Sequence, residues 1–220
     1  MLANNPFIMI TSSGKEKVVD RIKEKVELQM QINEAIKNGK IVILKGSPGV
    51  GKSTLLNLII QNIKKSSSVD VIREDFTPSI YNRLRTLTVG PIKKILIILD
   101  DFNNIELLDK NSQEKVLKLM SELASRTGVL LVENRNEGVE KDFRKMHIDI
   151  AKFDIIGLQR SDLKQLLIDR LNMVRDVPRD NLDPFTDDEF DKIYRKSGGN
   201  PRIALLICSA LYDQKETSII

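Results

Sequence analysis

The chain has 220 residues, 41% of them hydrophobic and 30% charged, and 35 Lys and Arg against 31 Asp and Glu give a formal net charge of +4. This length allows one sizeable core or one core with a small second domain, and the composition is typical of a globular protein. One cysteine and one histidine exclude an internal disulfide, a His and Cys zinc site and a histidine-based triad, while the small positive charge permits contact with nucleic acid.

The sequence contains no segment typical of a membrane or secreted protein. The longest apolar run near the motifs, residues 95–99, is far shorter than the ~20 residues of a membrane span, and no basic region precedes an apolar one at the N-terminus. A single cysteine suits a reducing compartment, and the apolar neighbours of Cys208 predict that it lies in a core. We therefore expect a cytoplasmic protein without membrane contact.

The first predicted element is a helix over residues 15–38, which stops at the helix-terminating pair Asn38-Gly39. Its buried face is expected to consist of apolar residues at helical spacing. These are Val18, Val19, Ile22, Val26, Met30 and Ile36.

Strands and helices alternate after this first helix. Continuous apolar runs are typical of strands buried on both faces, and their alternation with amphipathic stretches predicts a parallel sheet covered by helices on both sides. The predicted strands are residues 41–44, 69–72, 95–101, 129–136 and a fifth within 147–156, and the predicted helices between them are 54–65 and 113–126.

The character of the chain changes near Gly157, where a small helical domain is predicted. Ser161 is expected to cap a helix, and Thr186 with Glu189 three residues later matches a capping box. The run "GGNP" at 198–201 is expected to end that helix and start another. The predicted domains are therefore residues 1–156 and 157–220.

The stretch "KGSPGVGKST" follows the strand at 41–44 and matches the P-loop pattern G-x-x-x-x-G-K-[ST]. Glycines let the backbone curl so that successive N–H groups face phosphate oxygens, and the following helix adds its positive end. Lys52 would reach the β and γ phosphates, and the Ser53 hydroxyl would bind Mg²⁺. The predicted nucleotide-binding residues are Gly46, Ser47, Pro48, Gly49, Val50, Gly51, Lys52, Ser53 and Thr54.

Polar residues follow two of the buried strands, at the edge of a parallel sheet where ligands bind. Asp100 fits a magnesium ligand, and Asp101, on the other side of the strand, could polarise a water for attack on the γ phosphate. Glu133, Asn134 and Arg135 end a neighbouring strand, and the neutral amide of Asn134 is the candidate for positioning that water. Solvated strand-end acids and an ordinary turn asparagine are the alternatives.

Arg202 lies in the first turn of the last predicted helix, after Asn200 as the expected cap and Pro201 at the first helical position. A cation at this end of a helix is unfavourable to the helix dipole and calls for a compensating anion. A nucleotide phosphate would supply one, and an exposed surface arginine is the alternative.

Taken in this order, the motifs resemble those of an AAA+ ATPase: Walker A "GSPGVGKST", Walker B "ILIILDD", sensor 1 "LLVENRN" and sensor 2 "GGNPR". The resemblance covers nearly the whole chain. It implies an α/β P-loop NTPase with a parallel five-stranded sheet between helices, followed by a small α-helical lid. The stretches "NPF", "DRI" and "GGNPRIALL" resemble the initiator and loader clade, which includes archaeal origin-recognition proteins, DnaA and transposition ATPases of the TnsC and IstB kind.

Two features depart from this clade. The usual catalytic glutamate is Asp101 here, as in DnaA-like proteins, and the chain ends soon after the predicted lid, so we expect no winged helix or helix-turn-helix.

In the superfamily, an arginine just before the fifth strand completes the site of the neighbouring subunit. The resemblance assigns this role to Arg144, with Lys145 and Arg135 as competitors and a solvated charge run as the alternative.

The resemblance implies an ATP-dependent switch that hydrolyses ATP with Mg²⁺ and assembles as a homo-oligomeric ring or spiral. Its expected partners are double-stranded DNA and a replication or recombination protein. With no separate DNA-binding domain expected, DNA contact is predicted for the basic segment before the Walker B strand. The predicted DNA-binding residues, for which a solvated patch is the alternative, are Arg83, Arg85, Lys93 and Lys94.

Two other functions are compatible with the same sequence. A regulatory P-loop ATPase of the STAND kind would act as a nucleotide-gated protein-interaction switch that never touches DNA. A structural protein that binds ATP without hydrolysing it is compatible with the shorter acid at Asp101. Stimulation of turnover by DNA favours the initiator type, and undiminished function without DNA favours the regulatory type.

Overall fold

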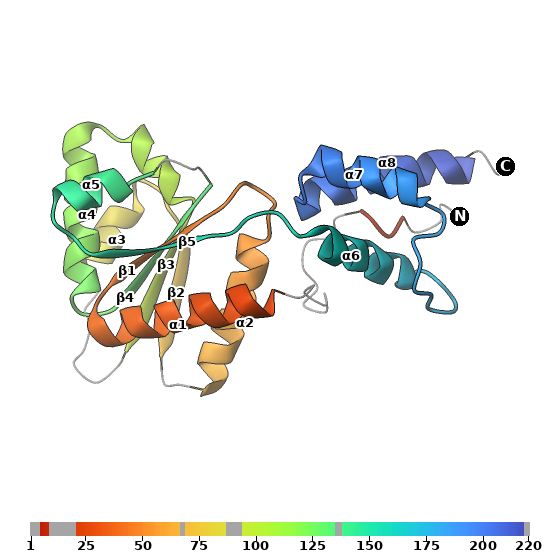
Figure 1. Ribbon diagram of the computed structural model, residues 1–220. Coiled ribbons are helices and arrows are strands. Elements are labelled where there is room, and N and C mark those ends of the chain that lie inside the picture. Colours follow the sequence, from red (N-terminus) through yellow and green to blue (C-terminus); the bar gives the residue numbers. More distant parts are fainter. Residues whose placement is uncertain (1–4, 9–20, 67–68, 87–93, 135–137, 218–220) are drawn as a thin grey trace. The chain divides into compact units, whose positions relative to one another are not determined.

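The computed structural model describes residues 5–8, 21–66, 69–86, 94–134 and 138–217 (Figure 1). Five parallel strands form one sheet in the order β2-β3-β4-β1-β5. The elements are α1 (Ile22–Asn38), β1 (Ile41–Lys45), α2 (Lys52–Ser66), β2 (Asp70–Asp75), α3 (Ile80–Arg85), β3 (Ile95–Asp100), the 3₁₀ helix η1 (Phe102–Leu107), α4 (Lys110–Ala124), β4 (Gly128–Glu133), α5 (Glu140–Lys145), β5 (Ile150–Asp154), α6 (Arg160–Asn172), α7 (Asp187–Ser197) and α8 (Pro201–Thr217).

The predicted architecture, a parallel five-stranded sheet between helices followed by further helices, is confirmed. β1 and β4 are buried along their whole length, as expected of strands with helices on both faces. Figure 1 shows α1 and α2 on one face of the sheet and α3, α4 and α5 on the other. Within the described part of the chain, no helix combines the length and apolar character needed to cross a bilayer.

The register brings the carboxyl ends of the central strands to one edge of the sheet. Lys45, the last residue of β1, pairs with Glu133, the last residue of β4. Asp100, the last residue of β3, pairs with Asp75 of β2. The P-loop, the acidic pair and Asn134 all follow directly from this edge, as the sequence predicted.

The predicted buried face of α1 is wrong. Ile22, Val26 and Met30 are more than half exposed, whereas the helix buries Leu28, Ile32 and Ala35. Two apolar stripes run along this helix, and only the packing against the sheet decides which of them is buried. Val18 and Val19 lie outside the described residues, and Ile36 is partly buried.

The chain divides into two compact units, one holding the sheet and the other the C-terminal helices. Of the described residues, the unit with the helices includes 5–8, Arg21, Gly49–Gly51 and 156–217. Phe7 of "NPF" is buried against Phe185 and Tyr212, with ring centroids 5.6 and 5.8 Å away. The amide of Asn5 donates to the Asp213 carboxylate at 2.8 Å.

Cys208 lies in the core of the helical unit, as predicted. Burial raises the pKa of its thiol to about 12, because a thiolate would lose its hydration there. The side chain is therefore a small core residue and not a nucleophile. The same core contains the apolar residues Leu163, Leu167, Phe190, Ile193 and Ala204.

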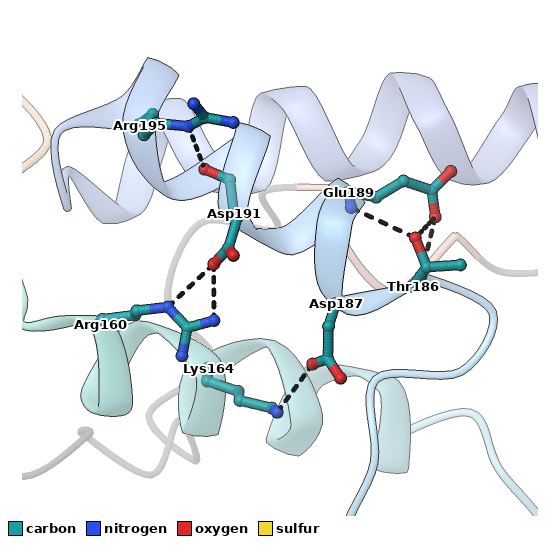
Figure 2. A network of polar contacts seen from close by, with 7 residues as sticks. All are labelled: Arg160, Lys164, Thr186, Asp187, Glu189, Asp191 and Arg195. Carbon is teal, nitrogen blue, oxygen red and sulfur yellow. Dashed lines mark hydrogen bonds and ion pairs between the residues drawn. The ribbon is translucent and has the colours of Figure 1, made fainter.

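Polar contacts join α6 to α7 within the helical unit (Figure 2). Arg160 donates two hydrogen bonds to Asp191, at 2.9 and 2.6 Å, and Lys164 pairs with Asp187 at 3.1 Å. The predicted capping box is confirmed, since the Thr186 hydroxyl accepts from the Glu189 N–H at 3.2 Å and the Glu189 carboxylate accepts from the Thr186 N–H at 2.8 Å.

The start of α6 differs from the prediction. Gln159 and not Ser161 is its N-cap, and no side chain caps the helix there. Ser161 is therefore the second residue of the helix, where its hydroxyl donates to Asp162 at 3.2 Å. Arg160, the first helical residue, also lies 5.0 Å from the Phe190 ring centroid, and this cation–π contact favours the earlier start.

Candidate functional site

The P-loop adopts the tight curve that its glycines predict. Gly49 and Gly51 have φ angles of 83° and 107°, in a region that side chains other than glycine rarely adopt. The loop leaves the buried strand β1 and enters α2 at Lys52. The backbone N–H groups of the loop therefore lie next to the N-terminus of a 15-residue helix, and the positive end of that helix favours a bound anion.

The two polar side chains at the start of α2 differ in their surroundings. The Lys52 ammonium donates to the carbonyl oxygens of Gly46 at 2.7 Å and Ser47 at 3.2 Å, so the positive charge is held over the loop. Lys52 is buried, whereas Ser53 and Thr54 are exposed in the first turn. A hydroxyl and an ammonium are therefore both available beside the curled backbone.

Asp100 at the end of β3 forms an ion pair that the sequence did not predict. The Nε of Arg73 on β2 donates to Asp100 Oδ2 at 2.6 Å, and Arg73 Nη1 donates to Asn57 Oδ1 on α2 at 2.6 Å. Arg73 was missed because the run around it has mixed polarity and no motif marks it. Strand alternation points Arg73 to the same face as Asp75, whose register partner is Asp100, and this was the signal available.

Asp101 and Asn134 are in contact at this edge of the sheet, although 33 positions separate them. The Asn134 side-chain amide donates to Asp101 Oδ1 at 2.5 Å, and the Asn134 N–H donates to Asn103 Oδ1 at 3.4 Å. Asp101 has a φ of 51°, an uncommon backbone conformation for a residue other than glycine. Strained backbone of this kind clusters at functional sites, where the surrounding structure enforces it.

A buried charge cluster lies behind the loop. The Lys45 ammonium is 3.3 Å from the Glu133 carboxylate and 2.6 Å from that of Glu140, and Lys45 and Glu133 are almost inaccessible to solvent. Burial raises the pKa of Glu133, and the charge of Lys45 opposes that rise. The cluster ties the end of β1 to the end of β4 and the first turn of α5. The sequence singled out Glu133 but missed Lys45.

The helical unit contains the predicted sensor arginine. Asn200 Oδ1 accepts from the N–H groups of Arg202 at 3.1 Å and Ile203 at 3.4 Å, which confirms Asn200 as the cap, and α8 begins at Pro201 as expected. The Arg202 N–H also donates to the Gly49 carbonyl at 3.4 Å. A Cβ on Gly49 would come within 2.5 Å of the Arg202 Cβ, so only glycine fits this approach.

Arg21 of the "DRI" stretch makes a further contact with the loop. Its guanidinium donates to the carbonyls of Val50 at 3.1 Å and Ile156 at 2.8 Å, and its side chain is buried. The sequence used Arg21 only for the family resemblance and gave it no structural role.

The remaining predicted basic residues lie on short elements. Arg144 is exposed in the last turn of α5, while its competitor Lys145 pairs with Asp142 at 3.0 Å. Arg83 and Arg85 are exposed on α3, which follows the carboxyl end of β2, whereas the exposed Lys94 precedes β3 at the opposite edge of the sheet. Arg135 and Lys93 lie outside the described residues.

The chemistry of the donor set fits a magnesium ion. A hydroxyl on Ser53 and a carboxylate on Asp100 are hard oxygen donors, and Mg²⁺ takes one or two such protein ligands together with phosphate oxygens and waters. The Asp100 carboxylate is already engaged through Oδ2 by Arg73, so any metal ligation shares this group with a guanidinium.

The family model described as "ABC transporter" matches residues 29–163, more than half of the chain. This stretch contains the P-loop, the acids after β3 and Asn134. No curated protein matches the chain.

The fold is similar to those of several solved structures. Drosophila ORC bound to DNA has 14% identity and a TM-score of 0.70, with 98% of this chain and 60% of that chain covered. Cdc6p from Pyrobaculum aerophilum has 14% identity and a TM-score of 0.61, with 96% and 66% covered. A Thermotoga maritima RuvB variant has 19% identity and a TM-score of 0.57, with 89% and 62% covered. The chain thus spans less than two thirds of each of these proteins.

Proposed function

Since this chain belongs to the ABC transporter family of P-loop NTPases by its sequence match and has the AAA+ fold, we propose that it is an ATPase that assembles on DNA as an initiator, loader or transposition-type regulator. The observation that carries the proposal is the meeting of Asp101 and Asn134 at the sheet edge from which the P-loop emerges. A phosphate-binding loop needs no such pair unless a water or hydroxyl is to be oriented beside it.

In this proposal the P-loop backbone and Lys52 bind the phosphates, and Ser53 and Asp100 hold Mg²⁺. The metal ion, when bound, neutralises charge on the phosphate oxygens. Asp101 accepts a proton from the attacking water, and the Asn134 amide keeps the carboxylate oriented through its hydrogen bond of 2.5 Å. Phosphoryl transfer depends mainly on positioning and electrostatics, which fixed side chains at a sheet edge supply.

Arg144 and Arg202 are proposed to contact the nucleotide from different subunits. Arg202 at the start of α8 would contact a phosphate of its own subunit, which would offset the unfavourable position of its charge at a helix N-terminus. Arg144, exposed on α5, would complete the site of a neighbouring subunit in a ring or spiral. Hydrolysis is then slow in the monomer and rises on assembly.

DNA contact is proposed for α3. The structures named ORC and Cdc6p share only 14% identity with this chain, so the likeness supports the fold, and DNA binding by this chain is a hypothesis. Arg83 and Arg85 are exposed, but Arg83 pairs with Glu74 at 2.9 Å, and DNA would have to compete for it. Repetition of α3 in an assembly would sum weak phosphate contacts.

A salt titration with labelled duplex tests this interaction. With ATP, the Arg83→Ala/Arg85→Ala variant is expected to bind more weakly and to show a salt slope shallower by about 0.9 for each phosphate that the variant no longer neutralises. A matched control, Lys192→Ala/Lys196→Ala, removes two exposed charges from α7 and should bind as the wild type does. Equal slopes for both variants would exclude α3 as the DNA site. If the wild type binds no DNA even at low salt, the regulatory-switch alternative is favoured.

A further inference from the structure

The guanidinium of Arg73 bridges the two elements that would hold the metal ion. It bonds Asp100 on β3 at 2.6 Å and Asn57 on α2 at 2.6 Å. Asn57 lies one helical turn beyond Ser53, on the same side of α2, because residues four apart share a helix face. The Arg73 guanidinium therefore contacts one proposed magnesium ligand, Asp100, and a residue one helical turn from the other, Ser53.

This pair is more enclosed than the ion pair of Glu74, on the same strand, with Arg83. The side chains of Arg73 and Asp100 are 25% and 16% exposed, compared with 69% and 32% for Arg83 and Glu74. A charge-assisted hydrogen bond gains strength as solvent is excluded from it. Arg160 supplies a matched control, because it pairs with Asp191 at the same distance, 2.6 Å, on helices that carry none of the proposed nucleotide ligands.

A guanidinium and a divalent cation compete for the same carboxylate. Arginine stays charged at every accessible pH, so it can leave Asp100 only by moving its side chain. The Arg73 guanidinium and a magnesium ion cannot both bind Asp100 Oδ2 at close range, because the two positive charges repel each other. Any ion that binds Asp100 must therefore displace Arg73 or accept its charge nearby.

We propose that Arg73 is an internal competitor of Mg²⁺ for Asp100 and sets the magnesium concentration at which nucleotide binds tightly. This inference rests on the proposed nucleotide site. Asn57 assists Arg73 by holding Nη1, so that the guanidinium stays aligned with the carboxylate. The structure thereby assigns a positioning role to two residues that lie outside the P-loop and Walker B motifs.

Removing the competitor should lower the magnesium requirement. In Arg73→Gln, the magnesium concentration that gives half of the nucleotide-dependent rise in melting temperature is expected to fall about tenfold, the change that corresponds to ~1.4 kcal/mol for one partly buried charged hydrogen bond. Asn57→Ala should shift it in the same direction by less. Arg160→Gln should leave it unchanged.

The experiment is thermal unfolding with saturating ADP, which excludes turnover, in a magnesium series that starts from EDTA. Wild type, Arg73→Gln, Asn57→Ala and Arg160→Gln are compared, and scans without nucleotide show that each variant folds. Should Arg73→Gln fail to fold, Asn57→Ala carries the test alone, because its exposed side chain leaves the core intact.

The outcomes separate this inference from the proposed function. A lower magnesium midpoint in Arg73→Gln and Asn57→Ala, with Arg160→Gln at the wild-type value, supports the competition. An unchanged or higher midpoint with a normal ADP response overturns it and leaves the nucleotide site standing. A wild type that ADP does not stabilise at any magnesium concentration overturns both.

Discussion

Asp101→Asn is expected to lower ATP turnover by about 10²- to 10⁴-fold, the contribution typical of a positioned general base. The asparagine has nearly the same size and keeps an oxygen for the Asn134 amide, which donates to Asp101 Oδ1 at 2.5 Å. It cannot accept a proton, so the chemical step is impaired while the local geometry is retained. Nucleotide binding, read from the melting temperature with ADP, should match the wild type.

The measurement is steady-state phosphate release at saturating Mg-ATP. Asp180→Asn, which makes the same change at an exposed position, is the control and should be fully active. Asn134→Ala is expected to slow turnover as well, and the double variant should be little slower than Asp101→Asn alone, because paired residues act as a unit. Wild-type turnover in Asp101→Asn would show that this acid is only a strand-end residue.

Arg144→Ala is expected to lower turnover by about 10³- to 10⁵-fold in the assembled protein, the range known for arginine fingers. The guanidinium would neutralise transition-state charge in the neighbouring site, so its removal affects the assembly and leaves the slow monomer rate unchanged. Arg144 is exposed on α5, and its substitution should not disturb the core.

The rate per subunit should therefore rise with protein concentration for the wild type and stay flat for Arg144→Ala. Lys145→Ala is the control on the adjacent position, and it should behave as the wild type does because Lys145 pairs with Asp142 on its own helix. If the wild-type rate per subunit is also independent of concentration, or if Lys145→Ala shows the same reduction, the finger is not Arg144.

The central strands were predictable because each is a continuous apolar run buried on both faces. β1, β3 and β4 begin and end within a few residues of the predicted limits, and β2 extends three residues further than predicted. The six-residue helices α3 and α5 were not predicted, since a helix of less than two turns carries little periodicity. Such helices form because the fold encloses them.

The meeting of Asp101 with Asn134 was predictable from one rule, that parallel strands deliver their carboxyl ends to a common edge. To predict the pairing of Arg73 with Asp100, one must also know which strand neighbours β3 and in which register the two strands pair. The burial of Lys45 beside Glu133 and Glu140 depended on tertiary packing in the same way. A single sequence does not fix strand order, so these contacts came only from the structure.

The position of Phe7 in the fold could also not be predicted from the sequence. Phe7 is one apolar residue in a mixed stretch, and it packs against Phe185 and Tyr212, far along the chain. Local pattern carries no information on such distant partners, so the packing of Phe7 in the helical unit could not be predicted from the sequence. The capping residues of α7 and α8, by contrast, act within one turn and were predicted correctly.

Thermal unfolding with and without Mg-ATP, for wild type and Lys52→Ala, tests most directly whether this loop is a nucleotide site. At about a hundred times its dissociation constant, bound ATP should stabilise the wild type by roughly 2.7 kcal/mol. Lys52→Ala should lose most of that stabilisation, because the ammonium held over Gly46 and Ser47 is the positive charge that the phosphates meet. An equal shift of the melting temperature in both proteins would contradict the assignment.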